Sequence, residues 1–501
     1  MDVRGRFAQL LIEAPDEATV IDFEDSWYSW GFVQGVATQL RSHVSEIGLG
    51  VNARIGVVLE NRPEHIAVVV SVLAFDGCLV TFSALQPAGR LAADVRAAAA
   101  PIVIASSEVL SREGVSDAIA DAGVVLEVTS DGAVVRRGGA ASTLQRDRPD
   151  VAVEMLTSGT TGPPKRVHLS NQQLNSGMAA NGTRPPDGQL FRKGVSIVTS
   201  PLVHISGFWS AVSPLYAGRS IAVLRRFDVQ SWVHIIERHR PKAAGLVPAA
   251  LRAVLDADVD PARLESLQVV TCGTAYCPPD LADRFFRRFG IRVLMIYGAT
   301  EFVGAIAMWT YKLHTEFWDS KAGSAGRASP GVDLRVVDDN GEVLEPGSVG
   351  QLEVRSAQSP SGPDAWVRTS DLGRVDEDGF LFITGRSDDA IVRGGFKVHP
   401  ANIIEALEGH PSVREAAVAP LPDQRLGQVP VAGVELVSCA TPPTTDELIA
   451  LCRKTLTAYE VPVHVVVFDA LPRTPSAKVS RVDLLTQIQE SIGTRHGEIP
   501  A

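Results

Sequence analysis

Residues 157–165 read Thr157-Ser158-Gly159-Thr160-Thr161-Gly162-Pro163-Pro164-Lys165 and directly follow the apolar run Val151–Leu156. The run predicts a strand, so this turn of glycine and hydroxyl residues begins where the strand ends. Glycines let backbone N–H groups converge on an anion, while the hydroxyls and the Lys165 ammonium add further donors. We therefore predict that the turn binds the oxygens of a polyphosphate. A flexible linker is the alternative, and the turn does not match the G-x-x-x-x-G-K-[ST] loop of kinases and GTPases.

Short apolar runs and periodic stretches alternate on both sides of this turn, from about residue 50 to residue 300. Strands are predicted at Arg54–Leu59, Cys78–Ser83, Ile102–Ser106, Val151–Thr157, Val195–Ser200, Ser220–Leu224, Leu267–Cys272 and Val293–Tyr297. Helices are predicted at Pro63–Phe75, Gln230–His239 and Pro279–Phe289, two of which begin with proline, whose missing N–H costs little there. This alternation predicts an α/β domain whose sheets are largely parallel.

The texture of the sequence changes after about residue 320, where glycine, proline and short alternating runs predict a β-rich lobe. From Arg386 onward, helices are predicted at Pro400–Gly409 and Thr445–Thr457, and strands at Ala416–Ala419, Ala432–Val437 and Val463–Phe468. The predicted fold class is therefore α/β. Residues 1–385 are predicted to form a large α/β domain with the β-rich lobe, and residues 386–501 a small α+β domain.

Composition excludes several classes of protein. The 501 residues are 45% hydrophobic, which allows a large core and excludes wholesale disorder. A net charge of −11 argues against nucleic-acid binding as the main function. The apolar run Ile66–Phe75 is too short to span a membrane, and the early acid in the N-terminal sequence is not typical of a signal peptide. Five cysteines without metal-ligand spacing favour a reducing cytoplasm, so we expect a cytoplasmic multidomain enzyme.

Further short segments resemble ligand-binding turns, although each alone could be an ordinary turn, hinge or exposed charge. They are Tyr297-Gly298-Ala299-Thr300-Glu301, Thr369-Ser370-Asp371-Leu372-Gly373, Gly385-Arg386-Ser387-Asp388-Asp389, Pro472–Lys478, Pro201–His204, Cys272-Gly273-Thr274-Ala275, Gly323–Arg327 and Gly394–Pro400. Their joint occurrence along the chain resembles the adenylate-forming superfamily of acyl-CoA synthetases, luciferases and nonribosomal-peptide adenylation domains. The resemblance extends from about Asn61 to Arg481 and is greatest to a stand-alone acyl-CoA synthetase.

The resemblance implies a reaction with two halves. A carboxylate attacks the α-phosphate of ATP to give an acyl-adenylate and pyrophosphate, and the thiol of coenzyme A then displaces AMP. It implies Lys478, Glu301 and Thr300 as catalytic residues, with Glu301 binding Mg²⁺ and Asp388 at the hinge of the small domain. The implied ATP- and AMP-binding residues are Thr157, Ser158, Gly159, Thr160, Thr161, Gly162, Lys165, Gly273, Thr274, Ala275, Tyr297, Gly298, Ala299, Thr300, Asp371, Arg386 and Lys478.

The acid and the acceptor are less well defined by the sequence. The resemblance places His204, Phe208, Trp209, Val303 and Gly304 beside the acyl pocket, and Arg226, Gly394, Gly395 and Lys397 near coenzyme A. The run Pro201–Trp209 has no acid for an ammonium group, which favours a non-amino carboxylate: fatty, aromatic or steroid-derived. A carrier-protein pantetheine or an amine is the alternative acceptor, a catalytically silent nucleotide-binding relative is the alternative class, and a homodimer stays open. Arg166 and Ala477 replace glycines that are usual in the family.

Overall fold

We describe the protein from a computed structural model, which describes residues 1–140, 147–156, 166–394, 396–437, 442–474 and 478–496. The chain forms two compact units. The first holds most of residues 1–333 together with Val354–Val367, and the second holds Leu334–Glu353 and Arg368–Ala501. The predicted α/β class, with a larger N-terminal and a smaller C-terminal part, is confirmed. The predicted domain boundary after residue 385 is not tested by this division and stays a prediction.

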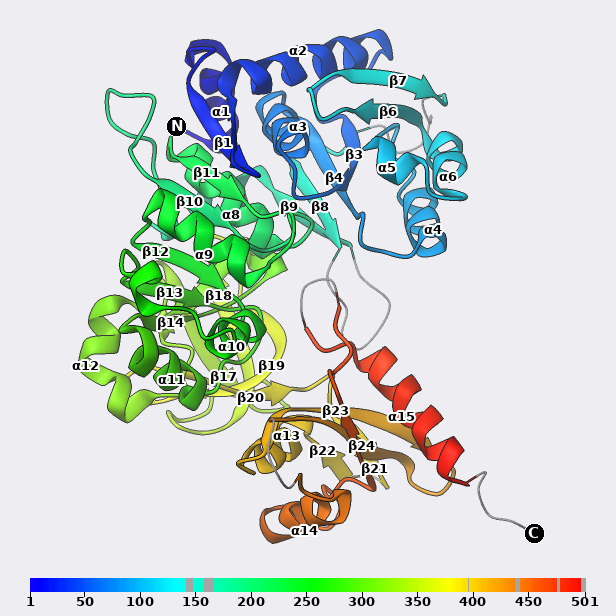
Figure 1. The fold of residues 1–501 in the computed structure, drawn as a ribbon, viewed down its shortest axis with the longest axis vertical. Coiled ribbons are helices and arrows are strands. Elements are labelled where there is room, and N and C mark those ends of the chain that lie inside the picture. Colours follow the sequence, from blue (N-terminus) through cyan, green and yellow to red (C-terminus); the bar gives the residue numbers. More distant parts are fainter. Residues whose placement is uncertain (141–146, 157–165, 395, 438–441, 475–477, 497–501) are drawn as a thin grey trace. The chain divides into compact units, whose positions relative to one another are not determined.

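The first unit contains a seven-stranded sheet, in the order β7-β6-β5-β3-β4-β8-β9 (Figure 1). Its strands are β3 (Arg54–Leu59), β4 (Cys78–Ser83), β5 (Ile102–Ala105), β6 (Val124–Val128), β7 (Val134–Gly138), β8 (Val151–Leu156) and β9 (Arg166–Ser170). The inner strands run parallel, while the edge strands β7 and β9 are antiparallel to their neighbours. The phosphate-binding turn predicted from the sequence therefore connects β8 to β9.

Helices cover both faces of this sheet, which is why its inner strands are continuously apolar. Ile55, Val57 and Leu59 belong to one buried cluster, whereas Val58 and Val80 belong to another on the opposite face. The helices are α1 (Val3–Glu13), α2 (Trp30–Glu46), α3 (Pro63–Ala74), α4 (Ala88–Ala98), α5 (Ser107–Leu110) and α6 (Val115–Ala122). Helices α1 to α3 cover the first face and α4 to α6 the second (Figure 1).

Two smaller sheets complete the first unit. Strands β10 (Val195–Val198), β11 (Ser220–Val223), β1 (Thr19–Phe23) and β2 (Ser26–Ser29) form one, in that order. The other has the order β12 (Ala243–Leu246), β13 (Val269–Cys272), β14 (Arg292–Ala299), β15 (Gly304–Met308) and β16 (Arg327–Ala328). The remaining helices are α7 (Asn171–Ala180), α8 (Ile205–Tyr216), α9 (Val229–His239), α10 (Pro248–Asp256), η1 (Pro261–Leu264), α11 (Pro279–Phe289), η2 (Thr300–Phe302) and α12 (Tyr311–Lys321).

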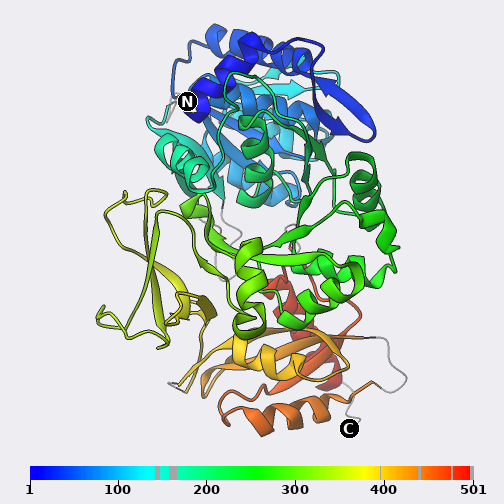
Figure 2. The same ribbon diagram turned by 90° about the vertical axis from the view of Figure 1, so that its left-hand side faces the viewer.

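Most residues of the remaining two sheets belong to the second unit. One sheet is β17 (Val332–Val337), β18 (Gly350–Ser356), β19 (Val367–Val375) and β20 (Leu381–Arg386). The other has the order β22 (Phe396–Val398), β21 (Ile391–Arg393), β24 (Gly427–Leu436) and β23 (Val413–Asp423), and β25 (His464–Phe468) pairs with β24. Helices α13 (Pro400–Glu408) and α14 (Thr445–Thr455) pack on one face of this second sheet, and α15 (Arg481–His496) packs on the other (Figure 2).

Hydropathy along the helices bears on membrane insertion. Over the described part of the chain, no helix combines the length and the apolar character needed to cross a bilayer.

Candidate active site

Two neighbouring parallel strands lead to several of the residues predicted to bind ATP and AMP. β13 pairs with β14 in parallel, with Cys272 opposite Met295, so both strands run toward the same edge of the sheet, and β14 continues past the end of β13. Gly273 follows β13 there, and a Cβ at this position would lie 3.0 Å from the carbonyl oxygen of Ile296. Tyr297 is the next residue of β14. The structure therefore brings the Gly273–Ala275 segment and Tyr297 together, although they are distant in the sequence.

The turn from β14 into β15, residues 300–304, has a strained backbone. Thr300–Phe302 form the short helix η2, and Val303 follows in the left-handed region with φ 57°. This conformation is unfavourable for a β-branched residue, and Val303 is fully buried. Gly298 lies opposite this turn, and a Cβ there would lie 1.9 Å from the carbonyl oxygen of Gly304. Strain of this kind persists only where the surroundings hold it, which is typical of functional sites.

Two buried glutamines hold this turn, and neither was predicted from the sequence. Gln173 Nε2 donates to the carbonyl oxygens of Glu301 and Gln358, at 2.9 Å in each case. Gln358 Nε2 donates to the carbonyl oxygen of Phe302 at 3.1 Å. The one signal in the sequence is Ser170-x-x-Gln173, a capping box that the structure contains at the start of α7. It identifies a helix start and gives no hint of residues 301 and 358.

The residues predicted for the acyl pocket lie in different surroundings. His204 is the N-cap residue of α8. Phe208 is buried and lines a small apolar cavity between α8 and α3, together with Ile66 and Leu202. The Trp209 ring lies against Gly177 of α7, and a Cβ on Gly177 would lie 3.0 Å from the Cη2 atom of Trp209. Trp209 also packs against the cluster that contains Val303. The acyl-pocket role of this set, which includes Gly304, stays a prediction.

Asn61 fixes the segment before His204, another contribution that sequence reasoning missed. Its Nδ2 donates to the carbonyl oxygens of Ser200 (3.1 Å) and Leu224 (2.9 Å). Its Oδ1 accepts from the backbone N–H of Leu202 at 2.8 Å. The buried Asn61 side chain therefore joins the end of β3 to the ends of β10 and β11.

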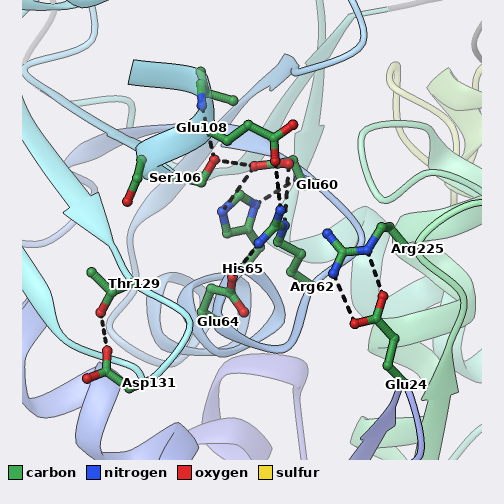
Figure 3. A network of polar contacts seen from close by, with 12 residues as sticks. Glu24, Glu60, Arg62, Glu64, His65, Ser106, Glu108, Thr129, Asp131 and Arg225 are labelled. Atoms are coloured by element: carbon green, nitrogen blue, oxygen red, sulfur yellow. Dashed lines mark hydrogen bonds and ion pairs between the residues drawn. The ribbon is translucent and has the colours of Figure 1, made fainter. Parts of the chain in front are cut away.

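Arg226 and its neighbour Arg225 are both exposed just after β11, and they differ in their ion pairs. The Arg225 guanidinium binds the Glu24 carboxylate through bonds of 2.8 and 3.1 Å, as Figure 3 shows. Within the described residues, the structure records no ion pair for Arg226. Nearby, the Arg62 guanidinium lies among the carboxylates of Glu60, Glu64 and Glu108 (Figure 3). Of these three arginines, Arg226 alone has a guanidinium left available for an anion.

In the second unit, two of the residues predicted to bind ATP and AMP face each other across a pair of strands. Asp371 of β19 is the register partner of Arg386 of β20. The Asp371 backbone N–H donates to Thr369 Oγ1 at 3.1 Å, and Arg386 Nη2 donates to Ser370 Oγ at 2.5 Å. The Arg386 guanidinium also binds Asp388, which raises the pKa of Arg386 and lowers that of Asp388. The predicted hinge residue is therefore an ion-pair partner of Arg386.

Lys478 lies within electrostatic range of the same pair of residues. Its carbonyl oxygen accepts from the backbone N–H of Thr474 at 2.7 Å. Burial lowers the pKa of Lys478, and the charge of Arg386 lowers it further, while the charge of Asp371 raises it. The second unit thus gathers three predicted site residues: an acid, a guanidinium and an ammonium group.

The glycines and lysine predicted near coenzyme A follow β21. Gly394 has φ 57°, a left-handed conformation that favours glycine, and its N–H donates to the carbonyl oxygen of Leu426 at 2.8 Å. Gly395 and the side chain of Lys397 lie outside the described residues, as does the whole of the predicted phosphate-binding turn: Thr157, Ser158, Gly159, Thr160, Thr161, Gly162 and Lys165. Ala477 lies outside them too.

Arg166, which stands where the family usually has glycine, makes its own contacts at the start of β9. Its guanidinium donates to the carbonyl oxygen of Thr81 at 3.1 Å and to Asp94 at 2.9 Å, and it lies over the Phe82 ring. These contacts join the start of β9 to β4 and α4. Arg166 therefore adds side-chain contacts at the point where the predicted phosphate-binding turn meets β9.

The donors near the turn fit a magnesium ion bound mainly by phosphate oxygens. Glu301 is half-buried, and its backbone carbonyl is fixed by Gln173. Among the described residues, no three His, Cys, Asp or Glu side chains are grouped so as to bind a metal. Mg²⁺ commonly takes one or two carboxylates and completes its shell with phosphate oxygens and water. A single carboxylate at this position is consistent with that chemistry.

Comparison with known families and proteins gives consistent matches. Residues 10–362 match the family described as AMP-binding enzyme, and residues 403–478 match the AMP-binding enzyme C-terminal domain. The chain is 30% identical to the indoleacetate–CoA ligase of Aromatoleum aromaticum over 494 residues, 93% of this chain and 94% of that protein. It is 32% identical to the fatty acid–[acyl-carrier-protein] ligase ScoC of Streptomyces coeruleorubidus over 351 residues, 67% of each protein.

Solved structures share the fold. The crystal structure of ATP-bound MatB from Rhodopseudomonas palustris superposes with a TM-score of 0.81, at 22% identity, over 98% of this chain and 100% of that chain. At this identity, the likeness establishes the common fold.

Proposed function

The chain belongs to the AMP-binding enzyme family, and we propose from this that it is an AMP-forming acid–CoA ligase. It joins a carboxylic acid to ATP, giving an acyl-adenylate and pyrophosphate, and then transfers the acyl group to the thiol of coenzyme A with release of AMP. The observation that carries this proposal is the match to an indoleacetate–CoA ligase, which spans 93% of this chain and 94% of that protein. The match therefore covers nearly the whole length of both proteins.

We assign the charge-stabilising roles of the first half-reaction to the second unit. Lys478 neutralises charge between the attacking carboxylate and the α-phosphate, Asp371 accepts from the ribose hydroxyls, and Arg386 assists there. The mutual electrostatic influence of these three groups supports the assignment. The nucleophile is already an anion, so the reaction requires no general base. Cationic groups supply the stabilisation that the developing charge requires.

We assign nucleotide positioning to the first unit. Gly273, Thr274 and Ala275 frame the adenine and Tyr297 stacks on it, with Gly298 and Ala299 completing the edge. Thr300 donates to a phosphate, and Glu301 is the carboxylate for Mg²⁺, which supplies positive charge to the phosphates when bound. The closeness of β13 and β14 at this edge supports these roles. Residues 157–165 are proposed to bind the phosphates.

We propose coenzyme A as the acceptor, contacted by Arg226, Gly394, Gly395 and Lys397. Residues 386–501 would then turn about Asp388 between the two half-reactions. A carrier-protein pantetheine or an amine is the second candidate, because a carrier-protein ligase is also among the relatives. The substrate is a non-amino carboxylic acid, with His204, Phe208, Trp209, Val303 and Gly304 beside it. A cytoplasmic location is proposed, because the four cysteines that the structure describes are free thiols.

The test is a panel of indole, phenylpropanoid, aryl and fatty acids in ATP–pyrophosphate exchange, which reports the first half-reaction alone. We expect exchange with at least one acid, and formation of its CoA thioester when coenzyme A is added. Exchange without thioester, but with acylation of a carrier protein or an amine, would favour the second candidate. Exchange at background across the whole panel would refute the proposed activity.

The role of Lys478 is tested by separating the two half-reactions. We expect Lys478→Ala to abolish exchange and to keep much of the ability to form thioester from a supplied acyl-adenylate. Equal loss in both assays would contradict the assigned role.

A further inference from the structure

A buried amide clamp, formed by Gln173 and Gln358, holds the backbone on which Glu301 stands. Gln173 Nε2 reaches the Glu301 carbonyl oxygen (2.9 Å), and Gln358 Nε2 reaches the Phe302 carbonyl oxygen (3.1 Å). The two side chains are also linked, because Gln173 Nε2 donates to the Gln358 carbonyl oxygen at 2.9 Å. Their solvent exposure is 5% for Gln173 and 1% for Gln358. Two successive carbonyl groups of one turn are thus bound by residues from distant parts of the chain.

The turn requires such support because it is strained. Val303 directly follows the two bound carbonyl groups and has a φ of 57°. A strained backbone conformation of this kind persists only when the surrounding structure holds it. Rotation of the peptide between Glu301 and Phe302 would break one or both of the hydrogen bonds that the glutamine side chains donate. The direction of the Glu301 side chain depends on this peptide, so the clamp fixes where the carboxylate points.

Burial of the Gln358 amide has a free-energy cost, and the hydrogen bond that its Nε2 donates explains why an amide stands there. Its Oε1 is buried and has no hydrogen-bond partner among the described residues. A buried acceptor without a partner is unfavourable, and an apolar side chain of the same size would avoid it. The amide at this position is therefore explained by what its Nε2 does, which is to bind the Phe302 carbonyl.

We propose that Gln173 and Gln358 are positioning residues that aim the Glu301 carboxylate at the metal ion accompanying the nucleotide. This inference rests on the proposed function, since it deepens the role given there to Glu301. Residues that orient a metal ligand commonly change metal affinity about 10- to 100-fold when they are replaced. The clamp acts on the ligand through its backbone, without contact to the cation itself.

A purely structural role must be separated from this one, because Gln173 also completes the capping box of α7. Its Oε1 accepts from the Ser170 N–H at 2.9 Å, and Ser170 Oγ accepts from the Gln173 N–H at 3.0 Å. Ser170→Ala removes half of the capping box and leaves the clamp intact. Gln358→Met removes one clamp bond and leaves the capping box intact. Gln173→Met affects both.

The experiment measures ATP binding by calorimetry as Mg²⁺ is varied, together with thermal unfolding and pyrophosphate exchange. We expect Gln173→Met and Gln358→Met to raise the Mg²⁺ concentration for half-maximal ATP binding by about tenfold, the size of a typical effect on a metal ligand's support. The KM for the acid should stay close to that of the wild type. Ser170→Ala should lower the unfolding temperature but leave the Mg²⁺ dependence unchanged. In a Glu301→Ala background, the two glutamine variants should have no further effect.

Several results would overturn the inference. They are an unchanged Mg²⁺ dependence in both glutamine variants, the same shift in Ser170→Ala, or additive shifts in the Glu301→Ala background. The absence of any Mg²⁺ effect on ATP binding by the wild-type protein would overturn it too. The proposed function fails in a different way: Mg²⁺-dependent ATP binding would be present, but no acid would support exchange. Calorimetry would still show whether the clamp controls the Mg²⁺ dependence in that case.

Discussion

The guanidinium of Arg386 binds the carboxylate of Asp388 through two hydrogen bonds, both 2.8 Å long, from Nε and Nη2. The same guanidinium donates to Ser370 Oγ, and the Arg386 backbone pairs with Asp371. In the proposed function, Arg386 binds the ribose and Asp388 is the hinge of the small domain. If these roles hold, ATP and the Asp388 carboxylate compete for the same guanidinium.

Replacing the hinge acid should strengthen nucleotide binding slightly. Asp388→Asn weakens the two-point ion pair, which leaves Arg386 free to bind the nucleotide. Both side chains are about two-fifths exposed, at 40% and 42%, so the pair stabilises the fold by less than about 1 kcal/mol. We expect an unfolding temperature close to that of the wild type and up to about fivefold tighter ATP binding by calorimetry. Weaker binding in Asp388→Asn, with Arg386→Ala unchanged, would contradict the competition.

The lowered pKa of Lys478 predicts a pH dependence with a definite sign. Burial and the charge of Arg386 lower this pKa in the folded protein, so the unfolded chain, with a pKa of about 10.4, binds the proton more tightly. Stability therefore rises with pH between the two values. Lys478→Met should be more stable than the wild type below this window, and the difference should shrink as pH rises through it. Thermal unfolding from neutral to alkaline pH measures both effects.

Arg386→Ala provides the control for this pH profile. Removal of the guanidinium charge raises the pKa of Lys478 toward its ordinary value, so the pH range over which stability rises should begin at higher pH in Arg386→Ala. A profile that does not move would show that Arg386 has no influence on the ammonium group.

Strand and helix positions followed closely from the sequence where burial is complete. The predicted strands Arg54–Leu59 and Cys78–Ser83 coincide with β3 and β4, because parallel strands buried on both faces are continuous apolar runs with clear ends. Helix α11 was predicted correctly from Pro279 to Phe289, between a proline start and Gly290, whose φ is 70°. By contrast, only Ala416–Ala419 of β23 was predicted, since Pro420 and Pro422 argue against a strand and the long pairing with β24 overrides them.

The candidate site divides in the same way between local signals and tertiary contacts. Asp371, Arg386 and Lys478 were proposed from the sequence because each stands in a recognisable short motif. Gln173 and Gln358 were not, because only the folded chain brings residue 173, residue 358 and the turn after β14 together. The positive φ of Thr274 and Val303 could not be predicted either, since neither residue type favours it. Long-range polar contacts and local strain are therefore what the sequence left open.

Gly298→Ala should disrupt the turn that carries Glu301. A Cβ at this position would lie 1.9 Å from the Gly304 carbonyl oxygen, a backbone atom that cannot move aside without opening the pairing of β14 with β15. We expect pyrophosphate exchange to fall at least about 100-fold, as small misplacements of positioning groups do elsewhere. Gly290→Ala is the control, because a Cβ there meets no atom within 4 Å and only its φ of 70° is affected. Comparable loss of exchange in both variants would contradict the argument.

The buried pair of Arg54 and Glu154 should be important for stability. Two bonds of 2.8 Å join side chains that are 2% and 1% exposed, in β3 and β8. Burial would raise the pKa of Glu154, but the hydrogen bonds and charge of Arg54 outweigh it and lower the pKa. Glu154→Gln leaves the buried guanidinium without a counter-charge, so we expect a loss of about 3–5 kcal/mol in the free energy of unfolding. Chemical denaturation measures it.

The same pair predicts sensitivity to acid. Because the folded pKa of Glu154 lies below its unfolded value of about 4.3, its stabilising contribution is present above that pH and is lost as pH falls through the folded pKa. The double variant Arg54→Met/Glu154→Leu should lose less stability than Glu154→Gln, since the fully buried guanidinium is removed together with its partner and only the more exposed Arg148 loses an ion pair. A double variant less stable than the single one would contradict this reasoning.

Arg226 and Arg225 offer a matched pair for locating coenzyme A. Arg225 is neutralised by Glu24, whereas Arg226 is exposed and has no recorded ion pair within the described residues. If Arg226 binds a phosphate of coenzyme A, Arg226→Ala should raise the KM for coenzyme A about 5- to 100-fold, as expected for a charge-assisted bond of about 1–3 kcal/mol. Pyrophosphate exchange should stay unchanged, because it does not involve the thiol.

Arg225→Ala is the control: it should lower the unfolding temperature slightly and leave the KM for coenzyme A within about twofold. An increased KM in Arg225→Ala alone would move the contact to the neighbouring residue, and no increase in either variant would exclude this end of β11 from coenzyme A binding.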